Sequence, residues 1–145
     1  MRNRVAVLHG VNLDVLGRRP SEHYGELTLP QLEMRIERYA RELGLEAVFF
    51  QSNHEGEYVE ELHKAPDYAD GLILNPGAWT HYAWSLRDAV EAAGLPCVEV
   101  HLSDVERREP FRRLSVLEDV RVGRVVGRGV DGYREALEQL KAALG

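Results

Sequence analysis

Residues 16–29, "LGRRPSEHYGELTL", gather arginine, histidine and tyrosine in one polar segment. These side chains can bind an anion or exchange a proton. Tyr24 is the unusual member, because a loop turns with glycine, proline or small polar residues and has no need of tyrosine. A loop tyrosine taken alone is more often an aromatic cover for the core than a reactive group. Tyr24 therefore indicates chemistry only if other polar residues accompany it.

Polar residues also follow the other predicted strands. In an open α/β sheet, ligands bind beyond the carboxyl ends of the strands. Side chains able to hold a carboxylate, hydroxyl groups and a developing oxyanion should converge there. They are Asn12, Arg19 and Tyr24 after the first strand, Gln51 and Ser52 after the second, Asn75 and His81 after the third, and His101, Ser103, Arg108 and Arg112 after the fourth.

Other catalytic chemistries lack their motifs in this chain. No two of the six histidines stand in H-x-x-x-H or H-E-x-x-H spacing, and the single cysteine excludes thiolate-rich sites, so we expect no metal. The only lysines, Lys64 and Lys141, fall on predicted outer helices, which disfavours Schiff-base catalysis. No G-x-S-x-G, no P-loop and no dinucleotide fingerprint is present. General acid–base catalysis remains.

The elements that must position these residues alternate along the chain. Apolar runs predict strands, and between most of them lie helical patterns, the first opened by a Thr28–Gln31 capping box and stopped by Gly44. This alternation predicts a flavodoxin-like parallel sheet of order 2-1-3-4-5 with helices on both faces. We expect a short helix at most in residues 102–119. The predicted strands are 4–9, 45–50, 70–75, 96–101 and 120–126, and further helices lie near 55–64, 79–93 and 131–144.

Length and charge limit the number of domains and the kinds of partner that this protein can have. The 145 residues predict a single domain, 1–145, and a net charge of −6 argues against broad nucleic-acid binding. The basic cluster "RREPFRR" at 107–113 instead suits a small anion. Strand-sized apolar runs predict no membrane span, and charges near the N-terminus do not indicate export, so a cytoplasmic location is the default. Cys97 reads as a buried small hydrophobe.

Three stretches, "LHGVNLDVLGRRPSEHYG", "LNPGAWTHYAWSLRDA" and "VEVHLSDVERREPFR", together resemble the type II 3-dehydroquinate dehydratases. The match in order, spacing and length covers essentially the whole chain. The resemblance implies a homododecamer of four trimers that uses no metal and no cofactor. It also implies the reaction, removal of water from 3-dehydroquinate to give 3-dehydroshikimate, in the shikimate pathway to aromatic amino acids or in quinate breakdown.

The resemblance also implies roles for individual residues. Tyr24 matches the base, Arg19 the group that activates it and His101 the acid. Asn12 matches the residue that holds a water on the enolate side, and Arg108 matches a lid arginine. The matches to substrate contacts are Asn75, His81, Asp88, Leu102, Ser103 and Arg112.

This chemistry explains a tyrosine in a polar loop. Removing a proton next to a ketone takes a strong base, and an unassisted tyrosine is almost wholly protonated at neutral pH. A nearby guanidinium favours the phenolate form. Tyrosinate would then remove the C2 proton, an enolate would form, and His101 would protonate the departing C1 hydroxyl.

Three expectations concern geometry around this set. Glu99 alternates with Val98 and Val100, so its carboxylate could orient the histidine that follows the strand. Arg108 and Arg112 are four apart and share one side if their segment is helical. His81 and Asp88, seven apart on one predicted helix, would be separated by about 10.5 Å along its axis. Asp88 should therefore reach a neighbouring subunit's site.

The chain departs from the family's usual pattern at a few positions, none of them a named catalytic residue. His9 and Val11 are expected to alter the first loop, and Pro20 the stiffness of the lid. Tyr82 and Asp104 are expected to alter hydrogen bonds around the site.

Two other classes of function stay open at this level. A non-catalytic binding module would keep the anion-binding arginines and have no use for a Tyr–Arg–His set. A different lyase or isomerase would keep the acid and base and change the substrate contacts. An absorbance assay for the conjugated enone product separates these three readings.

Overall fold

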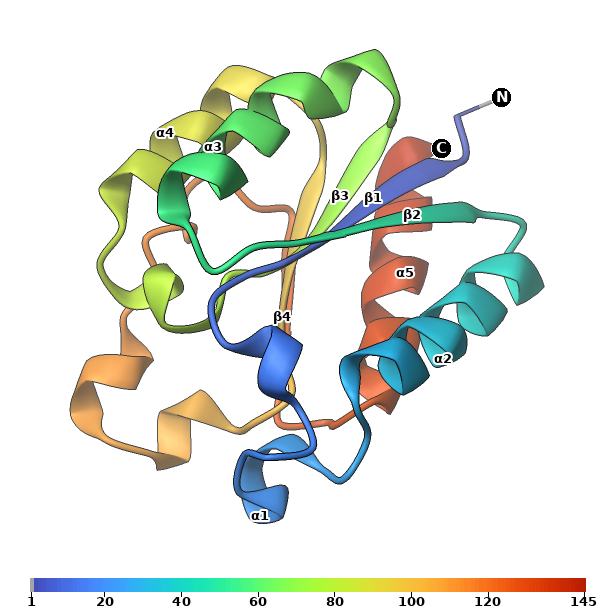
Figure 1. Ribbon diagram of the computed structural model, residues 1–145. Coiled ribbons are helices and arrows are strands. Elements are labelled where there is room, and N and C mark those ends of the chain that lie inside the picture. Colours follow the sequence, from blue (N-terminus) through green and yellow to red (C-terminus); the bar gives the residue numbers. More distant parts are fainter. Residues whose placement is uncertain (1) are drawn as a thin grey trace.

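Five strands form one parallel sheet of order β2-β1-β3-β4-β5, which confirms the predicted order (Figure 1). The structure is a computed structural model that describes residues 2–145. The last strand is shorter than the predicted 120–126, because Val120 and Arg121 both donate their backbone N–H to the Leu117 carbonyl in a turn. The strands are β1 (Arg4–His9), β2 (Glu46–Gln51), β3 (Gly71–Asn75), β4 (Cys97–His101) and β5 (Gly123–Val126).

Helices cover both faces of this sheet, as expected (Figure 1). On one face lie α2 (Leu29–Glu42) and α5 (Asp131–Leu144), and on the other lie α3 (Glu55–Lys64) and α4 (Trp84–Ala93). One further turn of helix, α1 (Ser21–Tyr24), sits in the segment expected to be a loop. None of the helices in residues 2–145 combines the length and the apolar composition that a membrane crossing requires.

The helix predicted near 79–93 is two elements. A 3₁₀ helix, η3 (Gly77–His81), ends where Tyr82 leaves the helical conformation at φ −153°, and α4 begins two residues later. His81 and Asp88 therefore do not share a helix axis, and the separation of 10.5 Å derived from one helix is wrong. Residues 102–119 hold only two 3₁₀ turns, η4 (Val105–Arg107) and η5 (Pro110–Arg113), which agrees with the expectation of a short helix at most.

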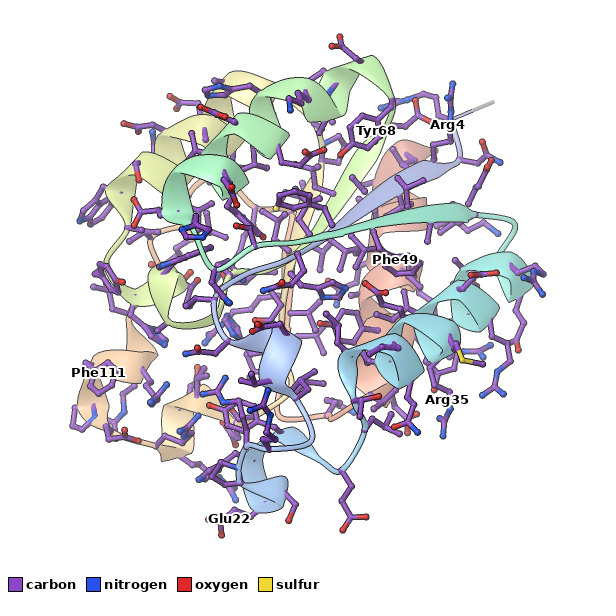
Figure 2. All side chains as sticks on the ribbon, viewed as in Figure 1. Arg4, Glu22, Arg35, Phe49, Tyr68 and Phe111 are labelled. Carbon is purple, nitrogen blue, oxygen red and sulfur yellow. The ribbon has the colours of Figure 1, made fainter. Side chains whose placement is uncertain are left out.

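The alternation of side chains along each strand divides the core into two layers. Val5 and Val7 of β1 pack under α2 and α5, whereas Ala6 and Leu8 pack under α3 and α4. Each large apolar side chain buried in this way contributes about 1.5–3 kcal/mol relative to exposure. Figure 2 shows Phe49 of β2 beside the α2 layer and Phe111 of η5 at the outer edge of the molecule. The two layers hold the central strands in place. Because these strands are parallel, their carboxyl ends lie at the same edge of the sheet.

The predicted capping box forms at the start of α2. The Thr28 hydroxyl accepts the Gln31 backbone N–H at 3.4 Å, and the Gln31 side chain accepts the Thr28 N–H at 3.0 Å. Such caps contribute about 0.5–2 kcal/mol. The cap is fixed four residues after Tyr24, which limits how far the Tyr24 segment can move from the sheet.

Two glycines bring the loops after β1 and β3 into backbone contact. A Cβ on Gly10 would lie 2.4 Å from the Pro76 carbonyl oxygen. Gly77 has φ +65°, and a Cβ there would lie 2.7 Å from the Val11 carbonyl oxygen. The Gly10 N–H donates to the Asn75 carbonyl at 2.8 Å. Only glycine fits at both positions, so the close approach of these two loops depends on Gly10 and Gly77.

Gly10→Ala should destabilise the protein, because the added methyl group must displace the Pro76 backbone. Overpacking of this kind costs about 1–3 kcal/mol, so thermal unfolding should begin at a lower temperature. Gly56→Ala is the matched control: it lies in α3, no atom is within 4 Å of the added Cβ, and the change favours the helix by up to about 1 kcal/mol. Equal melting temperatures for the two variants would contradict this account of the loop contact.

Candidate active site

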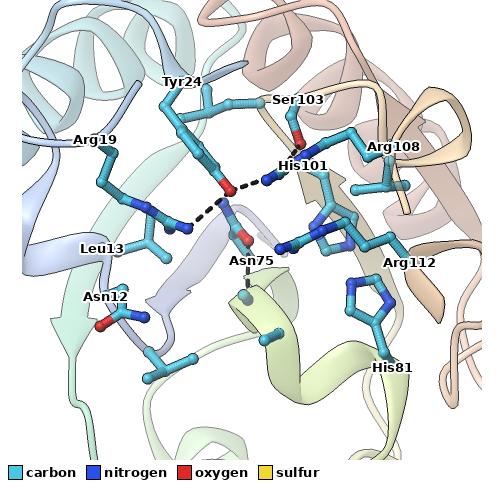
Figure 3. Close-up of a pocket in the computed structure, with 15 residues that line it drawn as sticks. Asn12, Leu13, Arg19, Tyr24, Asn75, His81, His101, Ser103, Arg108 and Arg112 are labelled. Atoms are coloured by element: carbon cyan, nitrogen blue, oxygen red, sulfur yellow. Dashed lines mark hydrogen bonds between the residues drawn. The ribbon is translucent and has the colours of Figure 1, made fainter. Parts of the chain in front are cut away.

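A pocket opens at the carboxyl ends of β1, β3 and β4 (Figure 3). Its volume is about 140 Å³, below the roughly 300–1,000 Å³ of pockets for drug-sized ligands, so it suits one small compact molecule. Every residue to which the family resemblance gives a catalytic or substrate role lines it, except Asp88. The lining residues are Val11, Asn12, Leu13, Arg19, Tyr24, Asn75, Gly77, Ala78, His81, His101, Leu102, Ser103, Val105, Arg108 and Arg112.

Tyr24 lies between two arginines. Its hydroxyl oxygen accepts hydrogen bonds from Arg19 at 2.8 Å and from Arg108 at 2.5 Å. The Arg19 guanidinium carbon also lies 3.8 Å from the centre of the Tyr24 ring. Charge-assisted hydrogen bonds of this kind are strongest to an anionic oxygen. Both donors are thus placed where they would stabilise a negative charge on this oxygen, and the contact from Arg108, 84 residues away, could not be found by sequence spacing.

Three guanidinium groups give the pocket a strongly positive character. Arg112 joins Arg19 and Arg108 in the lining, its side chain only 17% exposed, with a Glu109 carboxylate oxygen 3.2 Å from its Nε. No lining residue within the described range 2–145 is acidic. Such a pocket favours a ligand that carries a carboxylate.

The two loop arginines reach the pocket by a route other than the one expected. Arg108 follows η4 and Arg112 lies in η5, with an extended residue between the two turns. The condition that they share one side of a helix is therefore not met. Arg108 also donates to the Ser103 hydroxyl at 3.3 Å, so the loop itself holds this guanidinium against the end of β4.

His101 is held by a buried carboxylate, as the alternation along β4 indicated. Its Nε2 lies 2.6 Å from Oε2 of Glu99, which is fully buried. Burial alone would raise the pKa of the Glu99 carboxyl, but hydrogen bonds from His101, Thr80 and Ser115 outweigh it and hold the pKa well below its usual range. Glu99 is thus a carboxylate, and Nε2 of His101 donates to it. The other ring nitrogen, Nδ1, is the one left to exchange a proton.

His81 lies beside His101, and a hydrogen bond to the backbone fixes its ring. Its Nδ1 donates to the Leu114 carbonyl at 2.8 Å, and its ring stacks on that of His101 with centroids 6.3 Å apart. Burial lowers the pKa of His81, and the neighbouring His101 and Arg112 add to the effect. The neutral ring then presents Nε2 as a hydrogen-bond acceptor, which suits a ligand hydroxyl.

Two asparagines complete the polar lining. The Asn75 Oδ1 accepts the Gly77 N–H at 3.1 Å, so the amide NH₂ is the donor of this side chain. Asn12 has φ 69°, the only positive φ of a non-glycine residue in the described part of the chain. Its backbone N–H donates to the Asn53 side chain at 2.8 Å. A strained residue held in place by a neighbour is typical of a functional site.

The residues expected after β2 support the pocket and do not line it. The Gln51 amide donates to the Gly10 carbonyl at 3.2 Å. Ser52 bonds to Glu57 at 2.5 Å at the start of α3. Asn53, which the sequence did not single out, holds the Asn12 backbone. The end of β2 and the residues after it therefore hold the loop that follows β1 in place.

Asp88 lies away from this pocket, on the outer surface of α4. Its side chain is 73% exposed and pairs with Arg87 at 3.1 Å. Tyr82, Trp84 and Leu114, from neighbouring segments, are each more than half exposed as well. In a single chain, Asp88 has no contact with the other site residues.

The donor sets present do not form a metal cage. Among residues 2–145, no group of three or more histidine, cysteine or acidic side chains is placed to hold a metal ion. Cys97 is fully buried in the α3/α4 layer, and burial raises the pKa of its thiol. A raised thiol pKa is the opposite of what a nucleophilic cysteine requires.

Comparison with known proteins assigns the family. Residues 3–141 match the family model described as dehydroquinase class II. The chain belongs to this family. It is 47% identical over 142 residues to the 3-dehydroquinate dehydratase of Pelotomaculum thermopropionicum, covering 98% of this chain and 99% of that protein. It is 49% identical over 138 residues to the one of Halothermothrix orenii, covering 95% and 93%. The crystal structure of type II dehydroquinase from Propionibacterium acnes superposes with a TM-score of 0.91 at 38% identity, covering 98% of each chain.

The positions where this dehydroquinase departs from the usual motifs lie mostly outside the pocket. His9 is a buried residue of β1, stacked on Phe49 with a Glu33 oxygen 3.1 Å away, and is not in the first loop. Tyr82 is 60% exposed. Asp104 caps η4 by accepting the Glu106 N–H. Val11 does line the pocket, next to Asn12, whereas His9, Pro20, Tyr82 and Asp104 do not.

Proposed function

We propose that the chain dehydrates 3-dehydroquinate to 3-dehydroshikimate through an enolate, with Tyr24 as the base and His101 as the acid and with no metal or cofactor. Family membership makes the chain a 3-dehydroquinate dehydratase, a lyase of the shikimate pathway. The observation that carries the residue assignment is the position of both groups in one small pocket, each held by a partner of opposite charge.

The first step removes a proton from C2, next to the C3 ketone. Tyr24 is suited to this step, because Arg19 and Arg108 both donate to its oxygen and stabilise the phenolate. The electron pair of the C2–H bond forms the enolate, and its charge develops on the ketone oxygen. A water held by Asn12 and the positive field of the pocket would meet that charge.

The second step expels the C1 hydroxyl. The enolate oxygen reforms the C3 ketone, the C2=C3 electron pair becomes the C1=C2 double bond, the C1–O bond breaks, and His101 supplies the proton that lets the oxygen leave as water. Glu99 binds Nε2 of His101, so Nδ1 carries the transferred proton. Tyr24 ends the cycle as a phenol and His101 as a neutral ring, and solvent restores both. The ketone already makes the C2 proton acidic, so an acid and a base are sufficient.

Substrate orientation falls to the remaining polar residues. Arg112 and the Leu102–Ser103 segment at the end of β4 would bind the carboxylate and nearby hydroxyl groups. Asn75 has an amide NH₂ that can donate and His81 an acceptor nitrogen, which together suit the ring hydroxyls. Arg108 spans the site from its loop and would close over the bound ring as a lid residue.

Tyr24→Phe should leave the fold intact and reduce kcat by at least about 100-fold, a barrier increase of about 2.7 kcal/mol or more. The ring and its packing remain, and only the oxygen that accepts the proton is lost. Formation of the conjugated enone, followed by absorbance with 3-dehydroquinate, measures the rate.

The matched control is Tyr68→Phe, which removes a hydroxyl bonded to Glu61 outside the pocket and should keep wild-type activity. A Tyr24→Phe enzyme with more than about a tenth of the wild-type kcat would assign the base elsewhere. No enone from the folded wild-type protein would contradict the activity itself, and would favour a binding module or a different lyase.

We propose further that the chain works as a homododecamer of four trimers, in which Asp88 completes a neighbouring subunit's site. The support is the position of Asp88 on an exposed face, away from its own pocket and in the same helix as the exposed Trp84, which lies beside the exposed Leu114. Apolar side chains gathered near one another on a surface are typical of interfaces. The cytoplasmic location stays a prediction from the sequence.

Asp88→Ala and Tyr24→Phe chains should complement one another. Each variant alone has poor activity, but co-refolded oligomers would contain sites that pair an intact Tyr24 with a neighbour's intact Asp88. Enone formation by the mixture should exceed the average of the two parents refolded separately. Activity equal to that average would show that Asp88 acts in its own chain or has no role.

A further inference from the structure

Glu99 is bound by more groups than the orientation of His101 requires. Its Oε2 accepts His101 Nε2 at 2.6 Å and the Thr80 hydroxyl at 2.5 Å. Its Oε1 accepts the Ser115 hydroxyl at 2.7 Å and an Arg121 N–H at 2.7 Å. A carboxylate has about four sites for hydrogen-bond donors, and all four are filled here. One of the four donors, Arg121, carries a permanent positive charge.

Arg121 reaches Glu99 from outside the pocket. It lies in the turn before β5, in the stretch that the sequence assigned to a strand, and it does not line the pocket. Its side chain is 15% exposed and also donates to Ser115 at 3.1 Å. Arg121 therefore has no access to a ligand, and any effect on the reaction must pass through Glu99.

The charges in this cluster fix the direction of that effect. With Arg121 present, Glu99 is neutralised by a cation even when His101 has no extra proton. Protonating His101 then gives two cations on one carboxylate. Without the arginine charge, the full negative charge of Glu99 would bind the His101 imidazolium and hold its proton. Electrostatic effects of this kind are large at a buried carboxylate.

We propose that Arg121 is a positioning residue that shares Glu99 with His101 and so keeps His101 a strong enough acid to release its proton to the leaving hydroxyl. The inference rests on the proposed role of His101 as the acid. Arg121 acts on that role through the carboxylate and makes no contact with the substrate.

Of the other ionisable groups around the cluster, Cys97 also feels the charge of Arg121, which lowers the pKa of its thiol, but burial raises that pKa by more and keeps the thiol protonated. His81 from η3 and Arg112 from η5 face His101, while Cys97 and Tyr58 lie near Glu99. His101 also shares the pocket with Tyr24, Arg19 and Arg108. A change at Arg121 leaves all of them in place, so a difference between variant and wild type reports the shared carboxylate.

The experiment compares Arg121→Gln with Arg121→Lys. Glutamine keeps a hydrogen-bond donor for Glu99 and loses the charge, whereas lysine keeps the charge. NMR titration of the ¹⁵N-labelled imidazole of His101, assigned by its loss in His101→Asn, gives the pH at which the ring loses its proton. We expect this midpoint to rise by about 0.5–1 pH unit in Arg121→Gln and to stay near wild type in Arg121→Lys.

Kinetics give a second readout. The high-pH limb of the kcat profile should move to higher pH in Arg121→Gln, kcat at neutral pH should fall, and KM should stay within about twofold, because the pocket is untouched. Arg134→Gln is the control, since it removes an exposed arginine paired with Glu42 on the far helices and should change neither quantity.

An unchanged His101 midpoint in folded Arg121→Gln would overturn the proposal. If Arg121→Gln does not fold, the Arg121→Lys variant provides the test. A His101 midpoint about 0.5–1 pH unit above wild type in Arg121→Lys would overturn the proposal, because the positive charge is still present. The NMR result does not depend on turnover. A wild-type protein that fails to dehydrate 3-dehydroquinate would contradict the proposed function and leave the titration comparison standing.

Discussion

Two guanidinium groups converge on the hydroxyl oxygen of Tyr24, and the architecture around the pocket serves to hold them there. Arg19 comes from the loop after β1 and Arg108 from the loop after β4, so neither strand alone could build the site. Parallel strands with covered faces bring these loops to one edge, and the Gly10–Pro76 contact lets the first loop lie close against the third strand. Cations placed this close repel one another, and an anionic oxygen between them offsets that cost.

The site divides its charges between two ends. Two arginines donate to Tyr24, which suits the proposed base, and a carboxylate binds His101, which suits the proposed acid. One pocket can thus hold an acid and a base at the same pH, because the environments of the two groups differ. Arg121 also donates to Glu99, and in our proposal this shared contact keeps the carboxylate from holding the proton of His101 too tightly.

Features that depend on local sequence could be predicted, and features that depend on distant contacts could not. The Thr28 cap and the Glu99–His101 pair follow from spacing, because each involves neighbours in sequence or a period-two strand, and the strand order follows from the alternation of strands and helices. The bond from Arg108 to Tyr24 and the bond from Arg121 to Glu99 join residues on different elements, and no spacing rule contains them. The break at Tyr82 also escaped prediction, because apolar residues continue across it.

The central claim is that Tyr24 removes the C2 proton and His101 acts only afterwards. Exchange of the C2 proton of 3-dehydroquinate with D₂O, followed by ¹H NMR in a His101→Ala enzyme, tests this order directly. We predict exchange that outpaces dehydration, because the base still forms the enolate while the hydroxyl cannot leave, and we predict its loss when Tyr24→Phe is added. Exchange at the same rate in the double variant would contradict the assignment of Tyr24 as the base.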